Sequence, residues 1–311
     1  MTEPAGQTRA SEVPAAAAGT WRLGDLTVNR LGFGAMRTTG TGGMDRGRPR
    51  DRDSSIAVIR RAVELGVDHL DTAAFYFSSL RSANELINAA LAAYPRAERD
   101  DIVVATKVGP HRDPSGHWWT ARPDQLRGLV EENLRQLGRD HLDVVNLRVM
   151  PAMTSLADHL GALVECRQAG LVRHLGLSNV SPEQLEEAVA LTEIVCVQNR
   201  HSLGYVRPDG EAILRRCAEL GIAFVPFFAI AGESREGTAV DRADEPVQLR
   251  RVATAHAATH AQVRLAWSLH QGSHVLAIPG TGDLGHLEEN VAAAAIRLTD
   301  DELAALTSES R

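Results

Sequence analysis

Short apolar stretches alternate with longer amphipathic stretches along most of the chain. The short stretches are rich in Val, Ile and Leu, as buried strands are, and the long ones have the apolar face of a surface helix. Regular alternation of strand and helix indicates a parallel sheet, because each helix returns the chain to the starting edge of the sheet. The predicted strands span residues 31–35, 67–72, 102–107, 142–148, 172–178, 194–199, 222–228 and 274–280.

Helices are predicted between these strands, and their ends carry ordinary start and stop signals. Ser181 and Pro182 form a typical helix start. Glycine adopts the left-handed conformation that often ends a helix, and it follows four of the patterns, at Gly66, Gly138, Gly170 and Gly221. The helical patterns span 54–65, 82–92, 123–137, 155–168, 182–190, 210–220, 246–258 and 261–270. This alternation predicts an α/β fold, a single-domain (β/α)8 TIM barrel.

The barrel is expected to occupy residues 20–311 and to begin with a short hairpin around Trp21 to Asn29. Residues 1–19 lack the basic start and long apolar run of a signal peptide and are expected to form a disordered tail. The rival architecture, a doubly wound sheet, would place a glycine-rich phosphate loop after its first strand. Residues 32–37 read GFGAMR, without the third glycine, and lead into a Gly- and Arg-rich loop, which argues against that fold.

Composition and charge narrow the class of protein. A chain of 311 residues with 44% hydrophobic content can bury a large core, and a net charge of -7 provides no basic field for nucleic acid. No stretch approaches the roughly 20 apolar residues of a membrane helix. Three cysteines, far apart in apolar segments, suggest reduced thiols and neither a disulfide framework nor a metal site. We expect a cytoplasmic protein with a small-molecule substrate and no nucleic-acid or membrane partner; the sequence specifies no oligomeric state.

Candidate chemistry collects at the carboxyl ends of the predicted strands, where the active sites of such barrels lie. Asp71 ends the second strand, and Tyr76 follows in the loop just beyond it. Lys107 ends the third strand and Arg148 the fourth. Packing alone would not select polar ends on strands that are otherwise apolar. The sequence therefore predicts one polar site at this end of the barrel.

Motifs at these strand ends resemble the aldo-keto reductase superfamily in order and spacing; they are DTAAFY, VVATKVG, GLSN, CVQN and IPGTG followed by HLEEN. The resemblance covers essentially the whole barrel. Within the superfamily, LDVVNLRVM, EIVCVQN and VPFF resemble a bacterial subgroup that includes pyridoxal-reductase-like enzymes. The resemblance implies an NAD(P)H-dependent oxidoreductase acting on a carbonyl group.

Tyr76 is the predicted general acid. A phenol with a pKa of about 10 must become more acidic before it can protonate a carbonyl oxygen usefully at neutral pH. A nearby ammonium has that effect because it stabilises the tyrosinate. Lys107 is expected to supply the ammonium, and Asp71 to hold it charged and oriented. By resemblance these are three of the family's four catalytic residues.

The fourth catalytic position departs from the family pattern. Where the family usually has a histidine, this chain has Arg148. A guanidinium is permanently charged and carries five donors in a planar fork. Four roles remain open: stabilising an alkoxide, lowering the pKa of Tyr76 further, holding an anionic substrate group such as phenolate, carboxylate or phosphate, or only pairing with a neighbouring acid.

The resemblance implies a nicotinamide dinucleotide cofactor, with NADPH favoured over NADH and no metal. Ser178, Asn179 and Gln198 match positions that hold the nicotinamide carboxamide, and Phe227 matches the aromatic residue that stacks on the nicotinamide ring. The remaining cofactor positions are the first-strand residues Gly34, Ala35 and Met36, the phosphate segment Gly280, Thr281 and Gly282, and the helix residues His286, Glu289 and Asn290.

The phosphate segment consists of small residues, which let backbone amides approach an anion. His286 stands where many relatives carry an arginine for the 2′-phosphate, and Glu289 and Asn290 match the pair that contacts adenine. Aromatic residues near the predicted barrel mouth are candidate substrate walls; they are Phe75, Phe77, Trp118, Trp119 and Phe228.

Three functions remain open from the sequence. The first is reduction of an aldehyde, ketone or imine, either a pyridoxal-like aldehyde or an intermediate of specialised metabolism. The second is a cofactor-binding, redox-sensing or regulatory barrel with weak turnover. The third is reduction of a polarised C=C bond, because relatives that reduce enones carry a changed residue at the position of Arg148. The presence of Asp71, Tyr76 and Lys107 favours the first.

Overall fold

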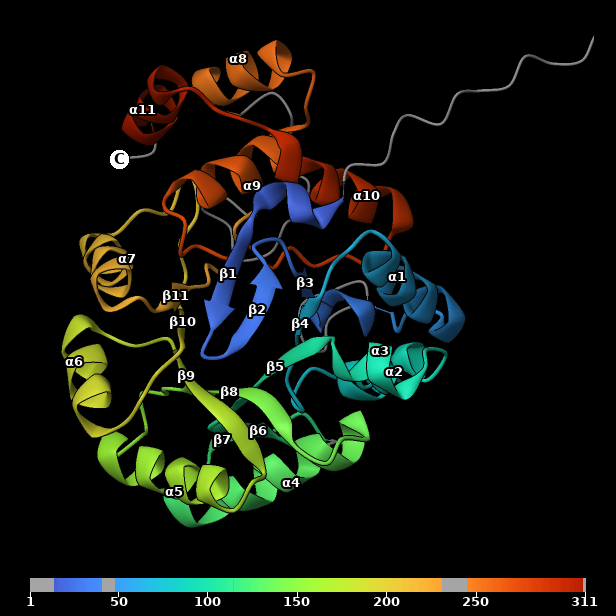
Figure 1. Cartoon of the computed structure of the whole chain (residues 1–311), viewed down its shortest axis with the longest axis vertical. Helices are drawn as coiled ribbons and strands as arrows, with labels where there is room; N and C mark the ends of the chain where they lie inside the picture. Colours follow the sequence, from blue (N-terminus) through green and yellow to red (C-terminus); the bar gives the residue numbers. More distant parts are fainter. Residues whose placement is uncertain (1–13, 41–47, 114, 231–244, 310–311) are drawn as a thin grey trace, which may run out of the picture.

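A parallel sheet of seven strands forms the centre of the computed structural model, which describes residues 14–40, 48–113, 115–230 and 245–309. The strand order is β11-β10-β9-β8-β5-β4-β3, and the sheet curls into a ring surrounded by helices (Figure 1). The strands are β3 (Phe33–Gly34), β4 (His69–Asp71), β5 (Val103–Val108), β8 (Leu142–Arg148), β9 (Val172–Ser178), β10 (Cys196–Gln198) and β11 (Ala223–Phe224).

The eighth strand position closes the ring without forming a regular strand. Isolated parallel bridges join Leu31 to Ala277 on one side and Phe224 to Val275 on the other. Pro279 has no amide hydrogen to donate to a neighbouring strand, although its carbonyl accepts from the amide of Gly34 at 3.0 Å. The predicted (β/α)8 barrel is therefore confirmed, whereas a full strand over 274–280 is not formed.

Helices lie between the strands within a few residues of the predicted limits. They are α1 (Arg52–Glu64), α2 (Ala83–Leu91), α4 (Leu126–Leu137), α5 (Leu156–Gln168), α6 (Pro182–Leu191), α7 (Pro208–Leu220), α8 (Val247–Ala255) and α9 (His260–His270). A further helix, α10 (Leu284–Ala292), follows the eighth strand position and contains the predicted helix residues His286, Glu289 and Asn290. Gly138 and Gly221 end α4 and α7 in the left-handed conformation, with φ of 64° and 70°. The start of α6 also matches its signal, because Ser181 accepts a hydrogen bond from the backbone of Gln184.

Several short elements were not expected from the sequence. The hairpin of β6 (Pro110–Arg112) and β7 (Trp118–Thr120) follows β5, and helices α3 (Arg96–Asp100) and α11 (Asp300–Glu309) lie outside the repeated unit. Short 3-10 helices also occur; they are η1 (Ala15–Ala18), η2 (Ala35–Thr38), η3 (Pro123–Gln125) and η4 (Ala293–Ala295). Except for α11, these segments are only three to five residues long, too short to display a helical or strand period clearly.

The expectation of a disordered tail to residue 19 is wrong for residues 14–19. Ala15 and Ala18 of η1 are buried, and the amide of Ala15 donates to the carbonyl of Leu65 at 2.9 Å. An alanine run has little polar character to keep it in water, so these residues pack against the barrel. Residues 1–13 lie outside the described residues.

The predicted N-terminal hairpin is formed by β1 (Thr20–Leu23) and β2 (Leu26–Asn29), which lie across the centre of the ring in Figure 1. Leu23 and Val28 pack into one cluster with inward-facing barrel residues such as Val103 and Val144. The hairpin thus plugs the amino-terminal end of the barrel with apolar side chains.

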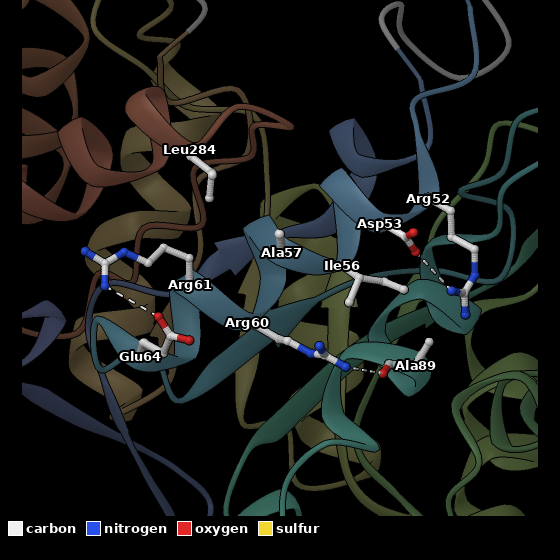
Figure 2. Close-up of a pocket in the computed structure, with 9 residues that line it drawn as sticks. All are labelled: Arg52, Asp53, Ile56, Ala57, Arg60, Arg61, Glu64, Ala89 and Leu284. Carbon is white, nitrogen blue, oxygen red and sulfur yellow. Dashed lines mark hydrogen bonds and ion pairs between the residues drawn. The ribbon is translucent and has the colours of Figure 1, made fainter.

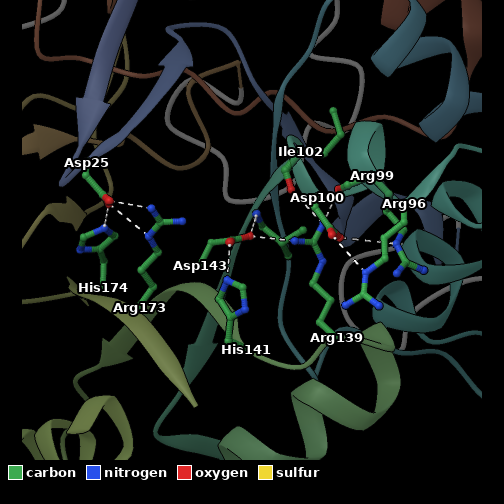
Figure 3. A network of polar contacts seen from close by, with 11 residues as sticks. Asp25, Arg96, Arg99, Asp100, Ile102, Arg139, His141, Asp143, Arg173 and His174 are labelled. Atoms are coloured by element: carbon green, nitrogen blue, oxygen red, sulfur yellow. Dashed lines mark hydrogen bonds and ion pairs between the residues drawn. The ribbon is translucent and has the colours of Figure 1, made fainter. Parts of the chain in front are cut away.

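Polar contacts hold the plug in place (Figure 3). Asp25, in the hairpin turn, accepts hydrogen bonds from Arg173 and His174 of β9, each at 2.6 Å. These bonds, with Arg173 the stronger influence, hold the pKa of the Asp25 carboxyl well below its usual range. Next to them, Asp143 accepts from Arg139 at 3.0 Å. The hairpin thus fills one end of the barrel, and the cavity described below lies at the other end, at the carboxyl ends of the strands.

Candidate active site

A cavity of about 560 Å³ lies at the carboxyl ends of the strands. Many of the predicted site residues line it, although they come from segments far apart in sequence. The predicted residues that line the cavity are Gly34, Met36, Asp71, Phe75, Tyr76, Lys107, Trp118, Arg148, Phe227, Phe228, Gly280, Thr281, Gly282 and His286.

Asp71 and Lys107 form a buried ion pair at the floor of this cavity, with residue exposures of 4% and 3%. Lys107 Nζ donates to Asp71 Oδ1 at 2.5 Å and to the carbonyl of Thr72 at 3.0 Å. Asp71 Oδ2 accepts from Gln198 Nε2 at 2.6 Å. Both carboxylate oxygens are thus engaged, which fixes the orientation of Asp71 and of the lysine it holds.

Tyr76 lies above this pair, with its ring centroid 4.9 Å from Lys107 Nζ. Burial by itself lowers the pKa of Lys107, but the charge of Asp71 and the interaction with Tyr76 outweigh it, and the pKa is raised. Lys107 is therefore an ammonium throughout the neutral range. Phe75 packs edge-on against the Tyr76 ring at 5.1 Å and limits its movement.

Arg148 extends into the cavity from the end of β8. Its Nη1 donates to Ser178 Oγ at 3.3 Å, and its guanidinium carbon lies 5.4 Å from the ring centroid of Phe227. In the part of the chain that the structure describes, no carboxylate pairs with it. A role confined to pairing with a neighbouring acid is therefore not supported, and the guanidinium retains donors for a ligand.

Ser178 and Gln198 are 0% and 1% exposed and lie next to the cavity, in contact with its lining residues Arg148 and Asp71. The Gln198 side-chain oxygen is buried and has no hydrogen-bond partner among the described residues. Such an orphaned acceptor is costly unless a donor reaches it. Asn179 follows Ser178 in the left-handed region, with φ of 62°, and its amide donates to the carbonyl of Val149 at 3.1 Å.

Gly34 and Gly280 are required by the barrel itself. A Cβ on Gly280 would lie 2.5 Å from the carbonyl oxygen of Gly34, and a Cβ on Gly34 would lie 2.7 Å from that of Ile278. The first strand and the eighth position therefore approach too closely for side chains here. Glycine is therefore needed at both positions for close packing of the backbone, in addition to any role in binding a phosphate, and the sequence alone did not indicate this.

Some predicted site residues lie away from the cavity lining. The Phe77 ring centroid lies 4.2 Å from the guanidinium carbon of Arg112, and the Trp119 ring packs at a tilt against the His111 ring, with 4.2 Å between the centroids. Phe77 and Trp119, which the sequence predicts as substrate walls, therefore lie outside the cavity lining, whereas Phe75, Trp118 and Phe228 belong to it. The other predicted residues outside the lining are Ala35, Ser178, Asn179, Gln198, Glu289 and Asn290.

The cavity also contains residues that sequence reasoning missed. Arg37 and Arg50 line it on the side of the phosphate segment, and Met150 and Ile230 contribute apolar surface. The Gly- and Arg-rich loop that contains Arg50 was noticed, but no period or motif assigns a direction to an arginine in a loop.

A separate hollow lies on the outside of the barrel between α1, α2 and α10 (Figure 2). Its basic side chains have partners on the same surface: Arg61 pairs with Glu64 at 3.4 Å, and Arg52 with Asp53 at 3.5 Å. It holds no group comparable to the buried ion pair of the barrel mouth.

None of the helices in the described part of the chain combines the length and apolar content that a bilayer crossing needs. Within the same residues, no three His, Cys, Asp or Glu side chains gather in a way that could hold a metal ion.

A closed parallel barrel with ionisable residues gathered at the carboxyl ends of its strands defines the class as a (β/α)8-barrel enzyme. The aldo/keto reductase family matches residues 30–310. The chain is 43% identical over 302 residues to pyridoxine 4-dehydrogenase of Escherichia coli (strain K12), covering 94% of this chain and 98% of that protein. The chain belongs to the aldo/keto reductase family and is an NAD(P)H-dependent oxidoreductase.

Solved structures agree with this assignment. A thermostable aldo-keto reductase in complex with the inhibitor epalrestat superposes with a TM-score of 0.77 at 28% identity, covering 93% of this chain and 99% of that one. An aldo-keto reductase from Klebsiella pneumoniae in complex with NADPH gives a TM-score of 0.73 at 26% identity, covering 93% and 94%.

Proposed function

We propose that this protein catalyses the NADPH-dependent reduction of a small carbonyl compound, with Tyr76 as general acid and Arg148 as anchor for an anionic substrate group. One observation carries the proposal. The buried pair of Asp71 and Lys107 lies directly beneath the Tyr76 ring, in the same cavity that Arg148 enters. Among the described residues, no carboxylate forms an ion pair with Arg148.

The nicotinamide cofactor fits the residues present. A carboxamide N–H2 group would supply the donor that the buried Gln198 oxygen lacks. Phe227 offers an aromatic face at the cavity wall, and the backbone of 280–282 borders the opposite side. When bound, the dinucleotide supplies a hydride for the carbonyl carbon. NADPH is proposed over NADH, as for the Klebsiella pneumoniae structure that contains it.

Proton delivery is assigned to the Tyr76 hydroxyl. As the carbonyl carbon is reduced, its oxygen gains negative charge and takes the phenolic proton, which leaves a tyrosinate. The Lys107 ammonium, 4.9 Å from the ring centroid, stabilises that anion, and Asp71 keeps the lysine protonated and in position. The low exposure of the pair strengthens these interactions because little water screens them.

Arg148 is assigned to substrate binding. Tyr76 and Lys107 already place an acid and a positive charge at the reacting oxygen, so a second fixed charge is better used on another part of the substrate. The Escherichia coli relative is named for pyridoxine, and the corresponding aldehyde carries an ionisable phenol next to its aldehyde group. A pyridoxal-like aldehyde therefore satisfies both Tyr76 and Arg148, and it is the substrate class proposed.

The proposal is tested by following NADPH absorbance with the purified protein. Pyridoxal is compared with pyridine-4-carboxaldehyde, which keeps the ring and the aldehyde but lacks the phenol. Faster turnover of pyridoxal is expected, mainly through a lower KM, because only pyridoxal offers an anion to Arg148. A preference for imines or enones in the same assay would contradict carbonyl reduction, and no turnover of any compound would favour a regulatory barrel.

The proposed location is the cytoplasm. Cys166, Cys196 and Cys217 are all buried free thiols, and burial raises the pKa of Cys217 to about 12. Such thiols are unreactive, and their reduced state fits a reducing compartment.

A further inference from the structure

The phosphate segment 280–282 has no basic residue of its own. The nearest candidate on α10 is His286, whose side chain is 71% exposed and whose Nδ1 lies 3.9 Å from Asp283 Oδ1. A single, largely solvated imidazole is a weak ligand for a phosphate dianion, because water competes with it. A cofactor phosphate at this rim would therefore need a stronger cation from another part of the chain.

Arg50 lies at that position. It comes just before α1, and its side chain crosses to the phosphate segment, where both it and Gly282 line the cavity. Its Nε donates to the carbonyl of Arg37 at 3.0 Å, and its Nη1 donates to the carbonyl of Gly282 at 3.3 Å. Two backbone carbonyls thus hold the guanidinium in place without neutralising it.

In residues 14–40, 48–113, 115–230 and 245–309, no carboxylate lies within ion-pair distance of Arg50. Its charge acts at longer range on Asp283, whose pKa is lowered mainly by the hydrogen bond from the His286 backbone and in smaller part by Arg50. By contrast, Arg52 and Arg61 nearby on α1 pair with acids (Figure 2). The nearby carboxylate of Asp283 accepts the amide of His286 at 2.9 Å as the cap of α10. Arg50 uses two of its five N–H donors on the carbonyls, and the rest remain for an anion.

Gly282 makes room for this arrangement. A Cβ at this position would lie 2.2 Å from Arg50 Nε and 2.5 Å from its Cζ. Gly282 is not among the glycines with positive φ, so its backbone does not require glycine. The guanidinium therefore packs directly on the glycine backbone, and a methyl group there would displace the arginine side chain without straining the main chain.

We propose that Arg50 binds the 2′-phosphate of NADPH and sets the preference for NADPH over NADH. The proposal rests on the proposed function, which places the nicotinamide next to Gln198 and Lys107. Arg50 lies at the opposite rim, next to the start of α10, which is the side left for the adenosine half. A planar guanidinium fixed at its Nε is suited to bidentate binding of a phosphate.

Binding to the full-length protein tests this without any need for turnover. Kd values are measured for NADPH, NADH and 2′,5′-ADP with the wild type, Arg50→Gln, Gly282→Ala and the control Arg52→Gln. Losing one charge-assisted contact corresponds to roughly a 10- to 100-fold rise in Kd. That rise is expected for NADPH and 2′,5′-ADP in Arg50→Gln, with NADH binding unchanged.

The other variants and ligands sharpen the result. Gly282→Ala is expected to change binding in the same direction by a smaller factor, and Arg52→Gln to match the wild type. Unchanged NADPH binding in Arg50→Gln, or equal weakening of NADPH and NADH binding, would overturn the assignment of Arg50 to the 2′-phosphate. The proposed function would not be affected by that result. A wild-type protein that binds neither dinucleotide would overturn the proposed function as well, so the two failures are distinguishable.

Discussion

Lys107 donates a 2.5 Å hydrogen bond to Asp71 across the junction of β4 and β5, with both side chains almost fully buried. Neighbouring parallel strands bring their carboxyl ends together, so residues 36 positions apart in sequence form one charged unit. Removing one member leaves the other charge buried without compensation, which costs about 3 to 5 kcal/mol in comparable pairs. Breaking the pair is therefore expected both to destabilise the fold and to remove the ammonium that stabilises the Tyr76 tyrosinate.

Asp71→Asn is expected to move the alkaline limb of the kcat/KM profile to lower pH. The charge of Asp71 helps raise the pKa of Lys107, while burial lowers it. Without that charge burial dominates, so the lysine loses its proton at a lower pH and no longer supports the tyrosinate. A pH–rate series for the reduction measures the limb, and circular dichroism checks that the variant is folded. An unmoved limb in a folded variant would contradict the assigned coupling.

Tyr76→Phe is expected to abolish turnover and leave the Kd for NADPH nearly unchanged. The hydroxyl acts on the substrate oxygen, and the aromatic ring that packs against Phe75 is retained. Stopped-flow or steady-state absorbance gives kcat, and fluorescence titration gives the Kd. Phe75→Tyr is a useful control, since it alters the neighbouring ring without removing the acid. Most of the wild-type kcat in Tyr76→Phe would show that another acid is used.

Substitutions of Arg148 separate binding from catalysis. If the guanidinium anchors an anionic group, Arg148→Lys should raise KM for pyridoxal sharply and for neutral aldehydes little, because lysine keeps the charge but loses the planar fork. If it instead stabilises the developing oxyanion, Arg148→Ala should lower kcat for every substrate by about 10²- to 10³-fold. We expect the first pattern. Wild-type kinetics in both variants would leave Arg148 without either role.

Protonation of His201 is expected to destabilise the folded protein at acid pH. The residue is 2% exposed, and its ring stacks on that of Trp267 with 5.4 Å between the ring centroids. Burial lowers the pKa of His201 from 6.5 to about 4. As the pH falls, His201 is therefore protonated in the unfolded chain before it is protonated in the folded protein. The contribution of the neutral His201 to the free energy of unfolding is present above pH 6.5 and is lost as the pH falls towards 4. At about 1.4 kcal/mol per tenfold change in proton affinity, the loss is at most roughly 3 kcal/mol.

Thermal unfolding between pH 7 and 4 measures this effect. The fall in Tm over that range should be smaller in His201→Phe, which keeps an aromatic ring against Trp267 and removes the titrating group. His286→Gln is the matched control, since the His286 side chain is 71% exposed. Parallel Tm curves for the wild type and His201→Phe would show that His201 does not contribute to the acid response.

The sequence by itself determined the barrel and much of its site. Alternating apolar and amphipathic stretches are a local property, and in a closed parallel barrel they bring the carboxyl ends of all strands to one mouth. Residues at those ends, such as Asp71, Lys107 and Arg148, could therefore be placed together before any contact was known. The helix ends at Gly138 and Gly221 could also be predicted, because the left-handed conformation that ends a helix depends on a single residue, and glycine adopts it easily.

Only the tertiary structure decided which way loop side chains point and which charges meet. In the sequence, nothing distinguishes Phe77 and Trp119 from Phe75 and Trp118, yet only Phe75 and Trp118 of these four line the cavity. Phe77 packs on Arg112 and Trp119 on His111. Arg50 reaches the backbone of Gly282 across 232 positions of sequence. No periodicity encodes such contacts, because a loop side chain takes its direction from the surfaces that surround it after the barrel has closed.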